Sequence, residues 1–169
     1  MIGYVPQEHI LFSKSVKDNI AFGKRNATLS DIEKAIKTAA FSEDLKRMPD
    51  GLETLIGERG VSISGGQKQR ISLARAFIRQ PEVLILDDSL SAVDAQTERR
   101  IIKNLQDIRA NQTTIIVTHR LSAIQQADWV LVLEDGQIVE EGTPNQLLNK
   151  GGWYAEQYQR QQHQKGGSK

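Results

Sequence analysis

Several features that would point to a compartment or a partner are missing from these 169 residues. There is no cysteine, which excludes disulfides and thiolate-bound zinc and fits a reducing compartment. The net charge of +1 predicts no general attraction to nucleic acid or to anionic lipid. The longest clean apolar run, residues 129–133, is far shorter than the ~20 residues of a membrane helix, and no signal peptide opens the chain. We therefore expect a soluble chain that reaches a membrane only through a partner or a segment outside this sequence.

A phosphate-binding loop, Gly-x-x-x-x-Gly-Lys-Ser/Thr, is also absent. The backbone N–H groups and the lysine of such a loop hold the phosphates of a nucleotide. Residues 1–7 read as a strand with no cap or turn before it. This beginning favours a chain cut inside its own domain, and a natural N-terminal edge strand is the alternative.

What is present is an alternation of strand and helix patterns, which predicts an α/β layered domain. Residues 83–86 are four apolar residues without alternation, typical of a strand covered on both faces in a parallel sheet. An Asp135-Gly136 turn predicts a hairpin. The other predicted strands are 1–7, 113–118, 129–134 and 137–141.

Capping patterns and apolar spacing predict the helices. A capping box at Ser30-x-x-Glu33 indicates one helix start, and the helix after Ser64 is expected to run for about four turns. The helix from Ala95 is expected to bury residues 101, 102, 105 and 108. Further helices are predicted from Ser15, over 42–49 and 120–126, from Thr143, and in the tail, where the helix frays before Gly166-Gly167.

Two glycines in Ser64-Gly65-Gly66-Gln67 let a backbone approach a ligand closely at a helix start. The free N–H groups and the positive dipole end of such a helix suit an anion such as a terminal phosphate. Ser64 can cap the helix or donate to phosphate. The alternative is a plain capped helix that follows a turn.

Polar residues follow several of the predicted strands, where open α/β sheets bind ligands. Asp87 suits a Mg²⁺ ion held through water, and its alternative role is a helix cap. Asp88 is placed for a general base, or for a local hydrogen bond. His119 can donate to a γ-phosphate, and the amide of Gln7 can reach the same metal or water.

Taken together, these segments resemble the later part of an ATP-binding-cassette (ABC) nucleotide-binding domain, over residues 1–148. Residues 11–20 and 54–60, which include Glu58, are similar to segments of ABC exporters, with multidrug exporters the closest likeness. The matching positions are Gln7 (Q-loop), Ile63 to Gln67 (signature, Ile for Leu), Val83 to Asp87 (Walker B), Ser91 to Asp94 (D-loop) and His119 (switch histidine).

The resemblance implies the fold of a partial P-loop NTPase, with a mostly parallel sheet and a small helical subdomain. It implies a partial nucleotide-binding domain over 1–152: a helical and signature subdomain at 8–80, and a core formed by 1–7 and 81–152. Residues 153–169 would form a C-terminal helix and a frayed tail. The implied ligands are ATP and Mg²⁺. The implied site residues are Asp88 and His119 (catalytic), Ser64, Gly65, Gly66, Gln67, Gln7 and Asp94 (nucleotide), and Asp87 with Gln7 (Mg²⁺).

The resemblance also implies partners. Two such domains pair head to tail, so that each signature completes the ATP site of the other. Gln7 and Glu58 would transmit the nucleotide state to transmembrane domains, which places the chain at the cytoplasmic side of the cell membrane. The implied function is ATP binding and hydrolysis coupled to export.

Two departures from the family pattern leave the enzymatic status of this chain open. Without the phosphate-binding loop, we expect no useful ATP affinity for the isolated chain. Asp88 stands where the family usually has glutamate, which pulls the carboxylate back by about 1.5 Å. A misplacement near 1 Å can cost about 10²-fold in rate. This is similar to the degenerate half of a heterodimeric exporter, whose signature completes the working site of the partner.

Other interpretations are a DNA-handling ABC ATPase, a cytosolic ABC translation factor and a non-catalytic interaction module. The DNA-handling class interrupts the domain with long coiled coils, for which Gln7 to Ser64 leaves no room. Loss of the upstream strand is expected to expose an apolar edge of the strand at 83–87. We therefore expect self-association of the chain.

Overall fold

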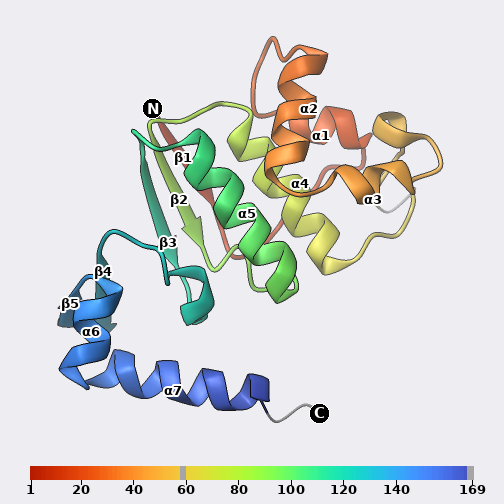
Figure 1. Ribbon diagram of the computed structural model, residues 1–169. Coiled ribbons are helices and arrows are strands. Elements are labelled where there is room, and N and C mark those ends of the chain that lie inside the picture. Colours follow the sequence, from red (N-terminus) through yellow and green to blue (C-terminus); the bar gives the residue numbers. More distant parts are fainter. Residues whose placement is uncertain (58–59, 167–169) are drawn as a thin grey trace. The chain divides into compact units, whose positions relative to one another are not determined.

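The computed structural model describes residues 1–57 and 60–166, which form two compact units, Met1–Thr118 and His119–Lys169 (Figure 1). Each unit has its own hydrophobic core. Glu58, one of the positions singled out by the sequence, lies outside the described residues. Within the described part of the chain, none of the helices combines the length and apolar composition needed to cross a bilayer.

Three parallel strands form the sheet of the first unit: β1 (Ile2–Val5), β2 (Val83–Asp87) and β3 (Thr113–Val117). This confirms the predicted α/β class. Their order is β1-β2-β3, so β2 is paired along both of its edges. The expectation that β2 has an uncovered edge is therefore wrong, because β1 and β3 occupy those positions and carry the outer edges of the sheet.

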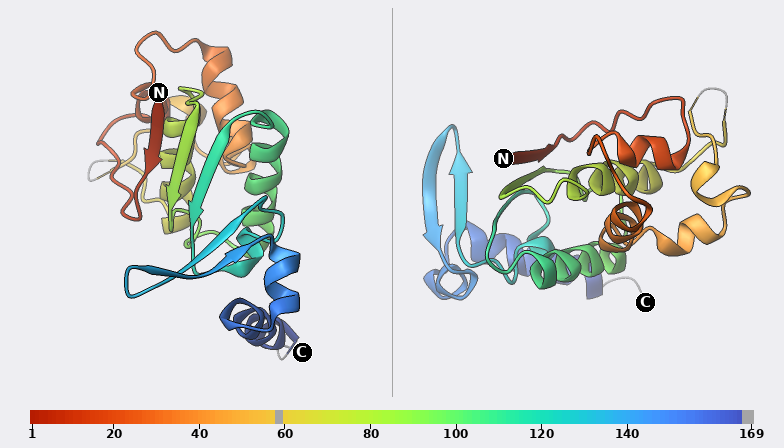
Figure 2. Two further views of the ribbon diagram at one scale, coloured as in Figure 1. Left: turned by 90° about the vertical axis from the view of Figure 1, so that its left-hand side faces the viewer. Right: turned by 90° about the horizontal axis from the view of Figure 1, so that it is seen from above.

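Two helices, α4 (Gly65–Phe77) and α5 (Ala95–Ile108), lie on the same face of this sheet (Figure 2). Alternate strand residues point toward them, and Val5, Leu84 and Leu86 are buried there. The opposite face, which we call the open face, exposes 46–66% of four side chains. These are Ile2, Tyr4, Ile115 and Val117.

The open face corrects one prediction from the sequence. Residues 83–86 were expected to be covered on both sides, but Val83 and Ile85 are only half-buried. Among the described residues of the first unit, helices cover only one face of the sheet. Successive side chains of β2 are therefore alternately buried and half-buried, although its sequence shows no alternation of apolar and polar residues. A second correction concerns Ile108, which is 59% exposed at the end of α5, where the helix no longer faces the core.

Short helices fill the chain between β1 and α4. They are α1 (Val16–Ala21), α2 (Leu29–Thr38), α3 (Ser42–Lys46) and a 3₁₀ turn at Gly51–Glu53. The cap of α2 is Thr28, with Asp31 completing the capping box, so the predicted cap at Ser30 is wrong. The helix begins at the earlier cap, Thr28, because Asp31 also accepts from Lys24 Nζ at 2.8 Å, which adds a charge-assisted hydrogen bond.

Gly23, just after α1, marks a close approach to α4. A Cβ atom at this position would overlap the carbonyl oxygen of Arg75 and crowd Ile78. Glycine is therefore the residue that fits where the end of α1 meets α4.

The second unit contains the hairpin of β4 (Val130–Glu134) and β5 (Gln137–Gly142), followed by α6 (Pro144–Lys150) and α7 (Trp153–Gly166). Asp135 and Gly136 both have positive φ, as the predicted two-residue turn requires. The predicted helix at 120–126 is a single 3₁₀ turn, Leu121–Ala123. Leu121 is buried in the core of this unit, which fixes the turn by packing rather than by helix propensity.

Candidate functional site

The ends of β1 and β2 bring three of the expected site residues together. Gln7 Nε2 donates to Asp88 Oδ2 at 3.3 Å, across 81 residues of sequence. Asp88 has φ +44°, in the left-handed region, and its backbone N–H donates to Val117 O at 2.8 Å. Aspartate tolerates this conformation better than most residues. The bond to β3 and the turned backbone aim the Asp88 carboxylate off the end of the sheet toward Gln7.

Asp87, the last residue of β2, has a partner that the sequence did not reveal. The Tyr4 hydroxyl donates to Asp87 Oδ2 at 2.9 Å. The hydrogen bond to this carboxylate, aided by its charge, raises the pKa of Tyr4. The alternation of β1 would have placed Tyr4 on one sheet face, but only the pairing of β1 with β2 shows that Asp87 shares it.

The donor set at these strand ends fits a magnesium ion. Asp87 and Asp88 supply carboxylate oxygens and Gln7 carries an amide oxygen, and Mg²⁺ prefers such hard ligands. No group of three or more histidine or acidic side chains within the described residues could hold a metal alone. Mg²⁺ is commonly bound by one or two carboxylates together with phosphate oxygens and water.

The Ser64 to Gln67 segment forms the capped start of α4. Ser64 Oγ accepts from Gln67 N at 3.2 Å, and Gln67 Oε1 accepts from Ser64 N at 2.9 Å. Ser64 and Gly65 are exposed. A Cβ on Gly66 would lie 3.0 Å from Ala92 O, so the helix start packs closely against the turn after Asp88. The capping role of Ser64 is therefore met, and the phosphate contact of this exposed helix start remains a prediction.

Arg70 fixes this helix start to α3. Its guanidinium group makes two hydrogen bonds to the Asp44 carboxylate and one to Ala40 O, and lies 5.5 Å from the ring centre of Phe41. Gln67 Nε2 also donates to Asp44 Oδ1 at 3.2 Å. Asp44 was not anticipated from the sequence, because its partners lie 23 and 26 residues away.

Asp94 caps α5 and its carboxylate is fully engaged within the chain. It accepts from Thr97 Oγ1 at 2.6 Å and from the backbone N–H groups of Gln96 and Thr97 at 2.9 Å. The Thr97 side chain, together with these backbone bonds, lowers the pKa of Asp94. The exposed carboxylate therefore stays charged, and its nucleotide contact remains a prediction.

His119 opens the second unit and is exposed. Its backbone oxygen accepts from Gln161 Nε2 at 2.9 Å, which ties this residue to α7. The same Gln161 side chain accepts from Leu121 N at 3.0 Å. The backbone at His119 is therefore held by its own unit, and its contact with a γ-phosphate remains a prediction.

Two polar residues near the site were missed by the sequence reasoning. Gln69 is fully buried in α4, and its side chain lies between Ala92 N at 2.9 Å and His9 Nε2 at 2.8 Å. Burial lowers the pKa of His9, and the charge of Asp88 partly opposes this by raising it. The only signal in the sequence is a glutamine on the buried stripe of a helix, which says nothing about its partners.

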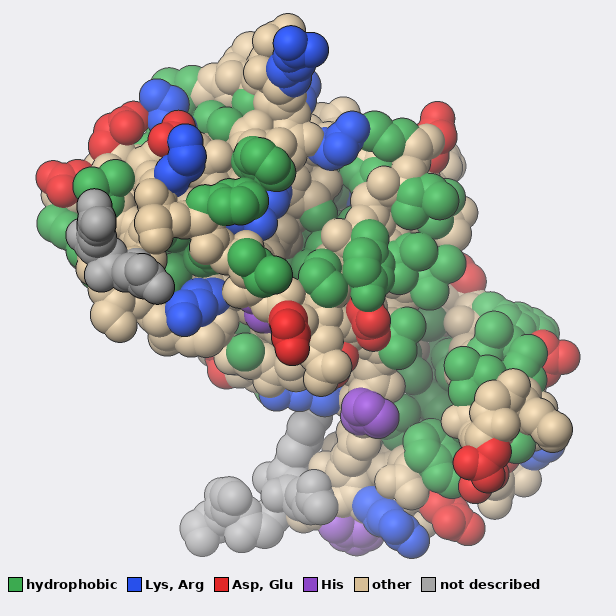
Figure 3. Space-filling model, turned by 180° about the vertical axis from the view of Figure 1, so that it is seen from behind, with side chains coloured by type: hydrophobic (Ala, Val, Ile, Leu, Met, Phe, Trp, Pro, Cys, Tyr) green, Lys and Arg blue, Asp and Glu red, His purple; other side chains and the backbone are tan. Residues whose placement is uncertain are grey.

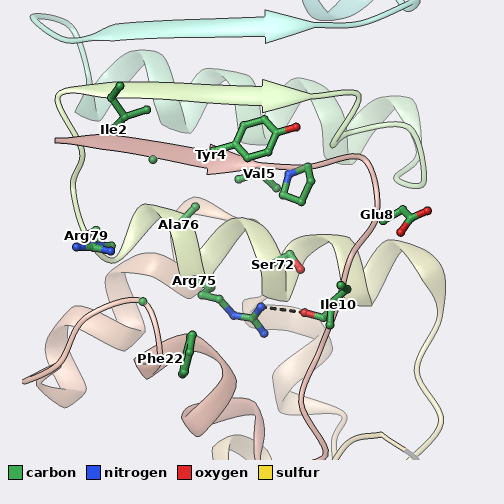
Figure 4. A pocket seen from close by; sticks show the side chains of 13 residues that line it. Ile2, Tyr4, Val5, Glu8, Ile10, Phe22, Ser72, Arg75, Ala76 and Arg79 are labelled. Atoms are coloured by element: carbon green, nitrogen blue, oxygen red, sulfur yellow. Dashed lines mark hydrogen bonds between the residues drawn. The ribbon is translucent and has the colours of Figure 1, made fainter.

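A groove of about 300 Å³ lies between β1, α4 and the end of α1 (Figure 4). Ile10 and Phe22 line it and are 69% and 71% exposed. Arg75 projects between them and donates to Ile10 O. Its guanidinium group also donates to Asn19, outside the groove, and lies 5.1 Å from the ring centre of Phe12. Figure 3 shows hydrophobic side chains gathered on the surface of the first unit. The fold thus holds two apolar residues outward beside a fixed cation.

Comparison with known proteins decides the family. The sequence model of ABC transporters matches residues 1–91. The chain belongs to the ABC transporter family. Over 95% of its length this ABC chain is 59% identical to the Bacillus subtilis (strain 168) protein called "Probable multidrug resistance ABC transporter ATP-binding/permease protein YheI". It is also 48% identical over 87% of its length to "ABC transporter B family member 21" of Arabidopsis thaliana.

A solved structure gives the same result for the fold. The structure of a bacterial Atm1-family ABC exporter with ATP bound matches 95% of the ABC chain with a TM-score of 0.90 at 39% identity. The predicted exporter-type ABC nucleotide-binding domain is thereby confirmed. The chain spans 28% of YheI, 11% of the Arabidopsis protein and 28% of the exporter chain.

Proposed function

We propose that this chain is part of the ATP-binding subunit of an ABC exporter, and that ATP binding and hydrolysis there drive export of a substrate. The observation that carries the proposal is the meeting of Gln7, Asp87 and Asp88 at the carboxyl ends of parallel strands. Ligands of open α/β sheets bind at such ends. The exposed, capped start of α4 supports a second phosphate contact.

The roles follow from the chemistry of each group. Asp87 and Gln7 hold Mg²⁺, which when bound neutralises phosphate charge. Asp88 accepts a proton from the attacking water or orients it, and His119 donates to the γ-phosphate. Ser64, Gly65, Gly66 and Gln67 offer backbone and hydroxyl donors to a phosphate, and Asp94 borders the same nucleotide.

The partner of this chain is a second nucleotide-binding domain, paired head to tail in a heterodimer. Asp88 is one methylene shorter than the glutamate usual in the family. The chain therefore supplies its signature segment to the working site of the partner, while its own Asp87–Asp88 site turns over slowly or not at all.

Calorimetry and steady-state kinetics test these roles. The isolated chain is expected to show no micromolar binding of ATP with Mg²⁺. In the full-length transporter Asp88→Glu should raise ATP turnover, since the longer side chain restores the reach of the carboxylate. Ser64→Arg, at the exposed helix start, should lower turnover strongly, and Lys68→Arg on the same helix is the matched control. Unchanged turnover in both Asp88→Glu and Ser64→Arg would refute the proposal.

The groove beside β1 is the surface through which this chain contacts the transmembrane part of the exporter, at the cytoplasmic side of the membrane. Phe22 and Ile10 offer apolar contacts and Arg75 offers a charge, which suits a short helix bearing an apolar anchor. In the full-length transporter, Phe22→Ala should uncouple transport from ATP turnover or prevent assembly. Leu29→Ala, at a comparably exposed position on α2, should do neither.

A further inference from the structure

The side chain of Gln69 links two segments that both belong to the site. It is fully buried in α4, five residues after Ser64. On one side it meets the backbone N–H of Ala92, in the turn that follows Asp88, at 2.9 Å. On the other side it meets His9 Nε2, two residues after Gln7, at 2.8 Å.

The backbone of Ala92 fixes the direction of both hydrogen bonds. A peptide N–H is always a donor, so the Gln69 atom facing it must be the oxygen. The amide nitrogen of Gln69 therefore faces His9, and an amide –NH₂ group only donates. His9 Nε2 must then offer a lone pair, which puts the ring proton on Nδ1. Nδ1 is buried and has no hydrogen-bond partner among the described residues.

These bonds close a ring of contacts around the site. Gln7 donates to Asp88 at 3.3 Å, and Ser91 Oγ donates to the backbone oxygen of Asp88 at 2.9 Å. Ala92, next in the chain, donates to Gln69 and also packs against Gly66 of the signature segment. Gln69 then leads through His9 and the backbone of residues 7–9 back to Gln7, so the contacts form a closed path.

We propose that His9 is a positioning residue, which accepts a hydrogen bond from Gln69 and thereby ties the Gln7 segment to the signature helix and to the turn at residues 89–93. The proposal rests on the function proposed above, to which it adds a positioning residue. The hydrogen bonds themselves need no nucleotide. A movement of Gln7 is then passed to the start of α4 and to the turn that follows Asp88.

Nitrogen-15 spectroscopy of the 169-residue chain tests the direction of the bond. The His9 ring is expected to show an unprotonated Nε2 and a protonated Nδ1. A scalar coupling should also join the Gln69 side-chain amide to Nε2, and it should vanish in Gln69→Met. A proton found on Nε2 would overturn the proposal.

Hydrogen exchange at Ala92 tests the link. His9→Leu removes the acceptor, so Gln69 is held less firmly and the Ala92 amide should exchange about fivefold faster. His9→Gln places an acceptor oxygen near the position of Nε2 and should keep the exchange close to that of the unchanged chain. A smaller acceleration is expected at the backbone N–H of Gln67, which donates to the cap residue Ser64.

Controls separate the link from simple packing. The double variant His9→Leu with Gln69→Met should exchange no faster at Ala92 than Gln69→Met alone, since both changes break one link. His163→Leu makes the same chemical change at an exposed position of α7 and should leave the exchange at Ala92 unchanged. Equal exchange in His9→Leu and His9→Gln, or additive effects in the double variant, would show that His9 only fills space. None of these measurements depends on ATP turnover, so a failure of the positioning role and a failure of the proposed function can be distinguished.

Discussion

The two faces of the three-stranded sheet are built from the same kinds of residue but have different surroundings. On one face Leu84 and Leu86 are fully buried under α4 and α5. On the open face Ile115 and Val117 remain about half exposed. The difference shows that apolar strand residues indicate what a strand is able to bury, while the neighbouring elements decide whether it does.

The largest expected effect separates the two faces by stability. Leu86→Ala should lower the free energy of unfolding by about 3 kcal/mol, because it leaves a cavity under the helices. Ile115→Ala on the open face should cost less than about 1 kcal/mol, since solvent already reaches that side chain. Urea denaturation followed by circular dichroism measures both. Similar losses for the two variants would mean that the open face is covered in solution.

Association in solution gives the next effect. We expect the open face to drive self-association of the isolated chain, because it adjoins the outer edges of β1 and β3, which pair with no further strand among the described residues. Replacing both Ile115 and Val117 by Lys should lower the self-association constant by at least about tenfold in sedimentation equilibrium. Ile108→Lys, at a somewhat more exposed isoleucine on α5, is the control. If the control acts as strongly, the open face is not the surface responsible.

The smallest expected effect concerns the hydrogen bond between Tyr4 and Asp87 at the polar end of the open face. The Tyr4 hydroxyl donates to charged Asp87, which favours the protonated phenol and raises its pKa. Asp87→Asn removes the charge, so the pKa of Tyr4 should fall toward its ordinary value. Spectrophotometric titration measures this change, with Tyr4→Phe identifying the signal that belongs to Tyr4. A Tyr4 pKa that Asp87→Asn leaves raised would show that Asp87 is not the cause.

Local features of the fold could be predicted because their causes lie within a few residues. Ser64 caps a helix through its own Gln67, and Asp135-Gly136 turns a hairpin. The cap of α2 was misplaced by two residues because Thr28 and Ser30 both offer acceptable boxes. The bond from Lys24 to Asp31 favours the box at Thr28, and Lys24 lies outside the local pattern.

The residues of the site also divide into those that the sequence indicated and those that it could not. Strand ends indicated Gln7, Asp87 and Asp88, since parallel strands bring their carboxyl ends to one edge. Gln69 and His9 could not be found, because the bond joins residues 60 positions apart and depends on how α4 packs. The open face was missed for a related reason: a run of apolar residues records no information about which side a helix covers.

Gly23 gives the groove beside β1 an unusual point of control. Even a methyl group at this position would push the end of α1 away from Arg75 and carry the neighbouring Phe22 with it. The height at which Phe22 stands above the surface is therefore set by a residue that offers no side chain of its own. For the groove contact proposed above, a substitution at Gly23 is therefore expected to weaken assembly by displacing Phe22.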